Sequence, residues 1–157
     1  MDIYYKPISE SGKQMINYVC KYAPVELFKG FGQECAVLEE MPENFDKSDK
    51  IAHANLCGFG KSVIQAVLEG KVEELVLVNC CDSMRRVYDI IENTKKCKFL
   101  YMLDLPHEDN ECENIKFAQS IIRLKNAYER YSHRTFDREL FIKSLSLIHI
   151  SEPTRPY

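Results

Sequence analysis

The segment ELVLVNCCDSMRR, residues 74–86, decides the predicted fold, because an apolar run is followed directly by residues that start helices. The β-branched run over residues 74–78 is typical of a buried strand. Asp82 and Ser83 are residue types that accept hydrogen bonds from the free amides of a helix's first turn. We therefore place Cys81 at a strand-to-helix junction. Ligands in open α/β sheets bind at this edge, and the helix dipole there favours thiolates.

Strands and helices alternate along the rest of the chain. Strands are predicted over residues 34–38, 74–79 and 99–103, and helices over residues 9–22, 24–28, 51–68, 83–92 and 113–131. The helix over 51–68 allows a break at Gly58 and Gly60, and Gly70 is its expected C-cap. The last helix is amphipathic, with a predicted apolar side made of Ile115, Ala118, Ile122 and Tyr128.

This alternation implies right-handed crossovers and a parallel sheet with helices on both faces, as in Rossmann-like and flavodoxin-like α/β folds. Because three strands make a small sheet, we expect an incomplete part of a larger multidomain subunit.

Composition narrows the class of protein. The chain has 157 residues, 45% of them hydrophobic, which is enough for the core of one domain. The net charge is −3 and no Lys/Arg run is interleaved with aromatic residues, so no nucleic acid partner is expected. No apolar run reaches the ~20 residues that span a bilayer, and the start of the chain does not resemble a secretion signal. We expect a cytoplasmic protein whose seven cysteines are free thiols or metal ligands.

The stretch Leu145–Tyr157 resembles the translation of a transposon-derived sequencing adapter. We interpret it as a non-native tail and give His149 no role. The alternative is a genuine short element with a proline-rich end. On this interpretation residues 1–144 are the amino-terminal α/β domain of a truncated protein.

Two cysteines lie where the fold would bring ligands together. Cys57 and Cys81 each precede a predicted helix, so two thiols at neighbouring mouths of a parallel sheet could bind one soft metal centre. Adjacent residues at a strand's end point to opposite faces, so Cys80 and Cys81 cannot easily serve one site without a bend in the chain, and Cys81 is preferred as the ligand because it directly precedes Asp82 and Ser83. Gly60-Lys61-Ser62 is a weak nucleotide signal, because Asn55 stands where a P-loop has its first glycine.

Three motifs together resemble one family. They are NLCGFGKS at residues 55–62, NCCDSMRRVYD at residues 79–89 and YMLDLPH at residues 101–107. In this order and spacing they are similar to the 2-hydroxyacyl-CoA dehydratases, whose relatives include benzoyl-CoA reductase subunits. The resemblance covers about residues 22–140.

The resemblance implies a [4Fe-4S] cluster held by three cysteines, of which the first two match Cys57 and Cys81. The third lies far downstream in the family, so this chain alone would lack a ligand. The implied reaction is a radical elimination of water from a 2-hydroxyacyl-CoA through a ketyl, after one-electron activation. The implied partners are a second homologous subunit, a separate ATP-dependent activator protein and a CoA-thioester substrate. The fragment alone is expected to be inactive.

Several assignments stay open. Arg85 and Arg86 could balance a negative cluster or a CoA phosphate, or could simply bond nearby carboxylates. His107 could act as an acid or base at the strand's end, or could fix a turn. The alternatives to a dehydratase are a benzoyl-CoA reductase-like or double-cubane electron-transfer subunit and, in another class, a metal-free α/β partner module. The other cysteines are interpreted as buried or incidental thiols: Cys20, Cys35, Cys97 and Cys112.

Overall fold

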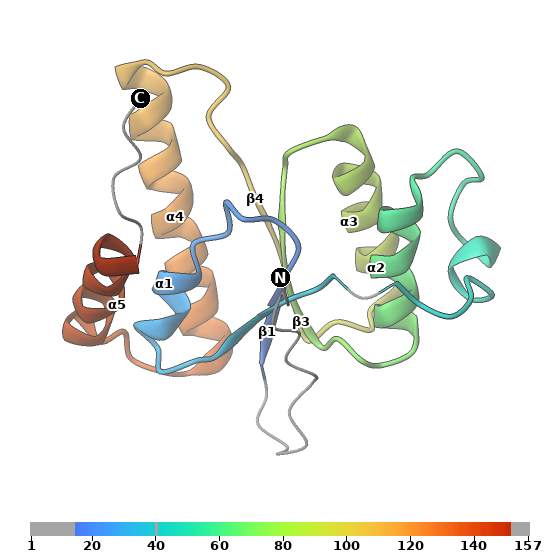
Figure 1. Cartoon of the computed structure of the whole chain (residues 1–157), viewed down its shortest axis with the longest axis horizontal. Coiled ribbons are helices and arrows are strands. Elements are labelled where there is room, and N and C mark those ends of the chain that lie inside the picture. The colour runs from blue at the N-terminus through green and yellow to red at the C-terminus, as the bar shows by residue number, and fades with distance from the viewer. Residues whose placement is uncertain (1–14, 40, 152–157) are drawn as a thin grey trace.

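The computed structural model describes residues 15–39 and 41–151, which form a parallel sheet with helices on both faces (Figure 1). The strand order is β2-β1-β3-β4. The strands are β1 (Ile16–Tyr18), β2 (Cys35–Val37), β3 (Glu74–Val78) and β4 (Phe99–Leu103). The predicted α/β fold is confirmed.

Five α-helices and one short 3₁₀ helix are described. They are α1 (Val25–Lys29), η1 (Ser48–Lys50), α2 (Gly58–Leu68), α3 (Asp82–Thr94), α4 (Glu111–Ser132) and α5 (Arg138–Ser151). Helices α2 and α3 cover one face of the sheet, while α1 and α4 cover the other, with α5 beside α1 (Figure 1).

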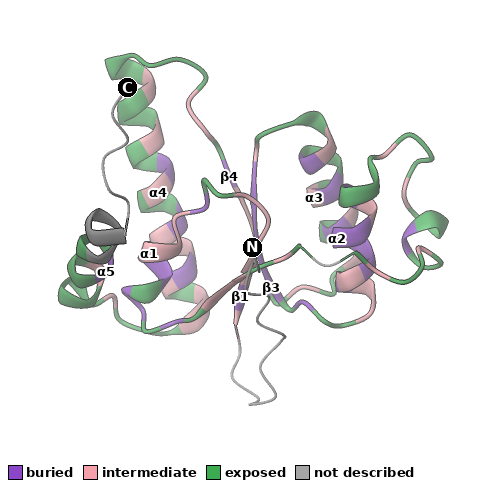
Figure 2. Ribbon diagram, viewed as in Figure 1, coloured by how far each residue is buried: buried purple, intermediate pink, exposed green. Residues whose placement is uncertain are grey.

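The central strand β3 separates two apolar cores, because its side chains alternate between the faces of the sheet. Val76 belongs to the core under α1 and α4, whereas Leu75 and Leu77 belong to the core under α2 and α3. All five residues of β3 are buried, and Figure 2 shows the buried residues facing the sheet from both layers. Burying one such aliphatic side chain stabilises the fold by about 1.5–3 kcal/mol.

A buried carboxylate fastens α4 to the amino end of β3. Glu74 is only 3% exposed. It accepts hydrogen bonds from the Tyr131 hydroxyl (2.9 Å) and the Tyr128 hydroxyl (3.4 Å). Burial raises the pKa of Glu74 above its ordinary value, while the two tyrosine hydrogen bonds oppose that shift.

The helix predicted over residues 9–22 is wrong where the structure describes it, because Ile16–Tyr18 forms β1. Residues 9–14 of that prediction lie outside the described part. Strand β1 lies between β2 and β3, pairing Asn17 with both Ala36 and Leu75. These partners are distant in sequence, and their pairing overrides the helical spacing of the local apolar residues. The sheet therefore has four strands rather than the predicted three.

The helix predicted from residue 51 begins later, at Gly58, because residues 51–57 form turns. The possible break at Gly58 is therefore where the helix starts. At the other end Gly70 has φ +78° and follows the C-cap Glu69, so a glycine ends the helix as predicted.

The predicted apolar face of the long helix is wrong at three of its four residues. Ile115 and Ile122 are 53% and 56% exposed, and Ala118 is exposed as well. Tyr128 is buried as predicted, and the helix also buries Leu124. The predicted and the buried residues both have helical spacing. The buried side is fixed by Tyr128, which packs edge-on against a set of aromatic rings: Phe28, Phe31 and Phe99.

Candidate functional site

Cys57 and Cys81 are the N-cap residues of α2 and α3. Both have extended backbone conformations, and both are exposed, free thiols. The Cys57 Sγ accepts a hydrogen bond from the Gly60 amide at 3.3 Å, whereas the Cys81 side chain makes no capping bond. Each cysteine therefore lies at the start of a helix, where the amides of the first turn have no partner within the helix.

The first turn of α2 lies close to the second turn of α3. A Cβ added to Gly60 would lie 3.0 Å from the Val87 Cγ2 and 3.4 Å from the Cys57 Sγ. A hollow of about 490 Å³ runs between the loop before α2 and the start of α3. Its lining includes Leu56 and Asp82, the residue before Cys57 and the residue after Cys81. The two predicted ligand-bearing loops thus border one hollow.

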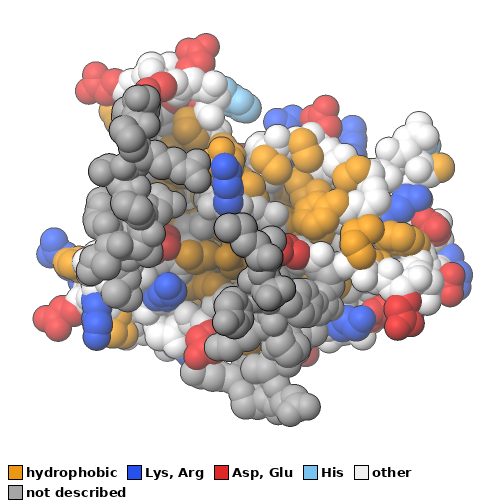
Figure 3. Space-filling model, in the orientation of Figure 1, with side chains coloured by type: hydrophobic (Ala, Val, Ile, Leu, Met, Phe, Trp, Pro, Cys, Tyr) orange, Lys and Arg blue, Asp and Glu red, His pale blue; other side chains and the backbone are white. Residues whose placement is uncertain are grey.

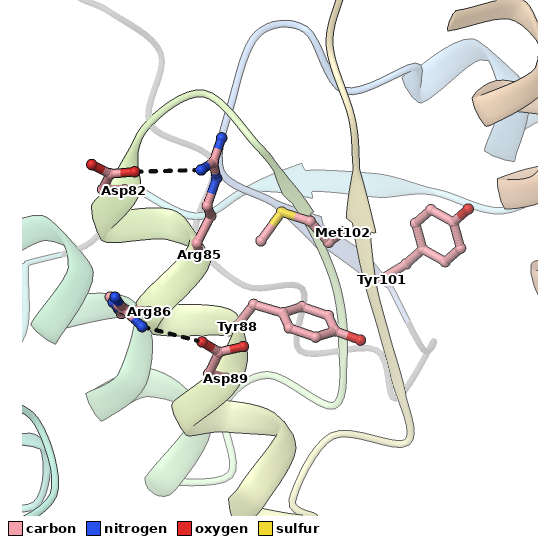
Figure 4. A pocket seen from close by; sticks show the side chains of 7 residues that line it. All are labelled: Asp82, Arg85, Arg86, Tyr88, Asp89, Tyr101 and Met102. Atoms are coloured by element: carbon pink, nitrogen blue, oxygen red, sulfur yellow. Dashed lines mark ion pairs between the residues drawn. The ribbon is translucent and has the colours of Figure 1, made fainter. Parts of the chain in front are cut away.

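A second hollow, of about 610 Å³, lies between α3 and β4. Its lining residues are Asp82, Arg85, Arg86, Tyr88, Asp89, Tyr101 and Met102 (Figure 4). Arg85 pairs with Asp82 at 3.5 Å and Arg86 with Asp89 at 4.0 Å. Of the two alternatives for these arginines, the structure contains the contacts with nearby carboxylates. Their relation to an anionic ligand stays a prediction.

A polar network crosses the carboxyl ends of β3 and β4. The Arg85 Nε donates to the Asn79 Oδ1 at 2.6 Å, and the Asn79 Nδ2 donates to the Asp104 Oδ1 at 3.0 Å. Asn79 and Asp104 are not among the site residues predicted from the sequence. The signal that could have found them is their position, because each directly follows a strand whose neighbour ends at the same edge.

Strand alternation would point Cys80 and Cys81 to opposite faces. The structure differs, because the chain bends between β3 and α3. Strand β3 ends at Val78, and the Cys80 amide bonds back to the Val78 carbonyl at 2.8 Å, which bends the chain. The two thiols interact, and Cys20 lies near enough to affect Cys80. Partial burial, together with these thiols, raises the pKa of Cys80 to about 11. Cys20 follows the neighbouring strand β1, so its thiol belongs to the same edge of the sheet.

The other cysteines fit the interpretation as buried or incidental thiols. Burial raises the pKa of Cys35 to about 12 and that of Cys97 to about 11. Cys112 is exposed on the first turn of α4. Among residues 15–39 and 41–151, no group of three or more His, Cys, Asp or Glu side chains is arranged to hold a metal ion.

The nucleotide signal at Gly60-Lys61-Ser62 has a structural explanation. Lys61 pairs with Asp49 of η1 at 2.8 Å, and the Ser62 hydroxyl donates to the Gly58 carbonyl at 2.9 Å. No strand precedes this helix start, because residues 51–57 form turns. His107 is exposed in the loop after β4, where its backbone amide donates to Glu113 at 3.4 Å.

The surface gives no sign of a continuous basic patch on the face drawn in Figure 3, where the described Lys and Arg side chains lie scattered among Asp and Glu. The expected absence of a nucleic acid partner stays a prediction. Within the described residues, no helix is both long enough and apolar enough to cross a membrane.

Fold and site together define a parallel α/β domain in which cysteines occupy the N-cap positions of two neighbouring helices. The sequence profile of the family described as 2-hydroxyglutaryl-CoA dehydratase, D-component, matches residues 20–150. The chain therefore belongs to this family, and the resemblance inferred from the three motifs is confirmed. The match supports a dehydratase-type subunit. A comparison with curated protein sequences found no match.

Proposed function

We propose that the chain is a subunit of an iron–sulfur 2-hydroxyacyl-CoA dehydratase, with Cys57 and Cys81 as two of the ligands of a [4Fe-4S] cluster. When bound, the cluster supplies the one-electron chemistry by which water is removed from the 2-hydroxyacyl thioester. The observation that carries the proposal is the matched placement of two exposed thiols at the N-caps of neighbouring helices.

The donor chemistry fits such a cluster, since cysteine thiolates are its usual ligands. Both thiols are accessible, and the Cys57 Sγ already accepts a hydrogen bond from a helix amide, that of Gly60. The described residues add no third donor to this pair. The proposal therefore places the remaining ligand outside them, in keeping with the expectation of a truncated subunit.

The protein's own share of the reaction is to hold the cluster and shield it. The cysteine-bearing loops lead into α2 and α3, which pack against each other and against the sheet. The apolar side chains of this layer exclude water from the sheet. We propose that a second homologous subunit completes the site and that a separate activator hydrolyses ATP. We assign ATP hydrolysis to a separate protein because Lys61 is paired with Asp49 and because no strand directly precedes the helix that carries Lys61.

Anaerobic reconstitution with iron and sulfide tests the cluster. With a small thiol added to supply the ligand that this chain lacks, the wild-type chain should take up iron and sulfide and absorb visible light, whereas Cys57→Ala and Cys81→Ala should each lose most of the bound iron. Cys112→Ala is the matched control, since Cys112 is also an exposed thiol in the first turn of a helix. If the wild-type chain stays colourless, or if all three variants behave alike, the proposal is wrong.

The second candidate is a metal-free partner module, which is favoured by the absence of a three-donor group among the described residues. Such a module would bind the homologous subunit equally well with and without the two cysteines. An electron-transfer or reductase subunit would instead hold iron but fail to support dehydration of any 2-hydroxyacyl-CoA in the assembled enzyme. Iron analysis and the dehydration assay therefore separate the three candidates.

A further inference from the structure

Arg85 contacts residues on both sides of the cysteine pair. Its Nε donates to the Asn79 Oδ1 at 2.6 Å, and its Nη1 lies 3.5 Å from the Asp82 Oδ1. Its backbone amide also donates to the Cys81 carbonyl, at 3.4 Å. One side chain thus bridges the two ends of the loop formed by residues 79–82, which contains Cys81.

The loop is tied to β4 through Asn79. The Asn79 side chain donates to Asp104 at 3.0 Å, and the Asn79 amide donates to the Leu103 carbonyl at 2.8 Å. Because β3 and β4 are paired along their whole length, the position of Asn79 at this end of the loop is fixed. At the other end Asp82 is the first residue of α3, and its side chain, which is 96% exposed, has its described ion pair with Arg85.

Arg86 provides the contrast. It is the next residue on α3 and also lines the hollow in Figure 4, yet its ion pair is with Asp89, 4.0 Å away and further along the helix. The two arginines therefore share a helix, a charge and an exposed position, but only Arg85 spans the cysteine loop.

We propose that Arg85 is a positioning residue that holds the loop of residues 79–82, and with it the Cys81 thiol, in the conformation that receives a metal centre. This inference rests on the proposed function only in taking Cys81 as a ligand. The planar guanidinium suits the task, because its Nε and Nη1 present donors in fixed directions to two acceptors at once. A lysine at this position keeps the charge but offers a single point donor.

The first test uses the metal-free full chain and measures hydrogen exchange of the backbone amides at residues 80–82. In R85A and N79A these amides should exchange faster, on the order of tenfold, because the side-chain contacts that order the loop are lost. R86A should exchange like the wild type. The Gly60 amide, which donates to Cys57, serves as the internal reference and should keep its rate in every variant.

The second test uses the reconstituted chain and measures iron affinity and the electron paramagnetic resonance spectrum of the reduced cluster. Iron affinity should fall about tenfold or more in R85A and N79A, as is typical when groups that orient a ligand are removed. R85K should restore the charge around the cluster without restoring the affinity. R86A should match the wild type in both measurements.

The two tests distinguish failure of this inference from failure of the proposed function. Wild-type protein that takes up no iron contradicts the cluster, while the exchange measurement still decides whether Arg85 orders the loop. If R85A matches R86A in amide exchange, the positioning role is wrong. If R85K restores the iron affinity fully, Arg85 acts through charge alone and the positioning role is likewise wrong.

Discussion

Replacement of Glu74 tests how α4 is fastened to the sheet. Glu74 is 3% exposed and accepts hydrogen bonds from two tyrosine hydroxyls, at 2.9 and 3.4 Å. Glu74→Ala removes both acceptors and leaves a small cavity. Since an unpaired buried polar group costs about 1–3 kcal/mol, we expect the free energy of unfolding to fall by about 2–4 kcal/mol.

Glu74→Gln separates the charge from the hydrogen bonds, because the amide oxygen still accepts from a tyrosine hydroxyl. Burial raises the pKa of Glu74 in the folded state. An acid with a raised pKa contributes stability that is fully present below its unfolded pKa and is lost as the pH rises through the folded value. Wild-type stability should therefore decline relative to Glu74→Gln above about pH 4.3, by about 1.4 kcal/mol for each unit by which the pKa is raised.

Urea denaturation followed by circular dichroism, at intervals from pH 4.5 to 7.5, measures both effects. Glu73→Gln is the matched control, because Glu73 is the adjacent residue but forms an exposed ion pair with Lys98 at 2.6 Å. Exposed pairs contribute about 0–1 kcal/mol, so this control should change little at any pH. A constant difference between wild type and Glu74→Gln across this range would refute the pH argument, and equal stability of the Ala and Gln variants would refute the role of the tyrosine bonds.

Three further predictions concern single contacts. Gly30→Ala should destabilise the fold by about 1–3 kcal/mol in the same denaturation assay, because a Cβ there would clash with the Phe136 ring. Gln65→Leu should cost about 2–4 kcal/mol, since the buried Gln65 Oε1 accepts from the Ser48 amide at 2.8 Å and from the preceding amide at 3.1 Å. Alkylation of Cys35 near pH 8, measured by peptide mass spectrometry, should be roughly a thousandfold slower than that of an ordinary exposed thiol, because burial raises its pKa to about 12.

Elements that are specified by local sequence were predicted well, whereas elements that depend on contacts between distant segments were not. Strands β3 and β4 were predicted nearly to the residue, because each is a continuous apolar run bounded by polar or turn residues. Strand β1 was missed, because only its pairing with two distant segments distinguishes Ile16–Tyr18 from one turn of a helix. The face of α4 was misassigned, because the position of an aromatic cluster across the sheet is not encoded in local spacing.

The same contrast between local and distant information applies to the candidate site. The positions of Cys57 and Cys81 at helix starts follow from the residues beside them, and the structure places both at N-caps. The network joins Arg85 to Asn79, 6 positions away, and Asn79 to Asp104, 25 positions away. It exists only because β3 and β4 are adjacent strands that end at one edge, so no single motif predicts it.

The two ends of β3 perform different tasks, and this separation predicts independent effects of substitution. At the amino end Glu74 is buried and bonded to α4, whereas at the carboxyl end Cys81 is exposed and makes no side-chain capping bond. Cys81→Ala should therefore leave the free energy of unfolding of the metal-free chain within about 0.5 kcal/mol of the wild type while removing bound iron. Glu74→Gln should do the reverse, changing stability with pH but leaving iron uptake intact. If Cys81→Ala unfolds the metal-free chain, the thiol is part of the packed structure, and its loss of iron would say nothing about ligation.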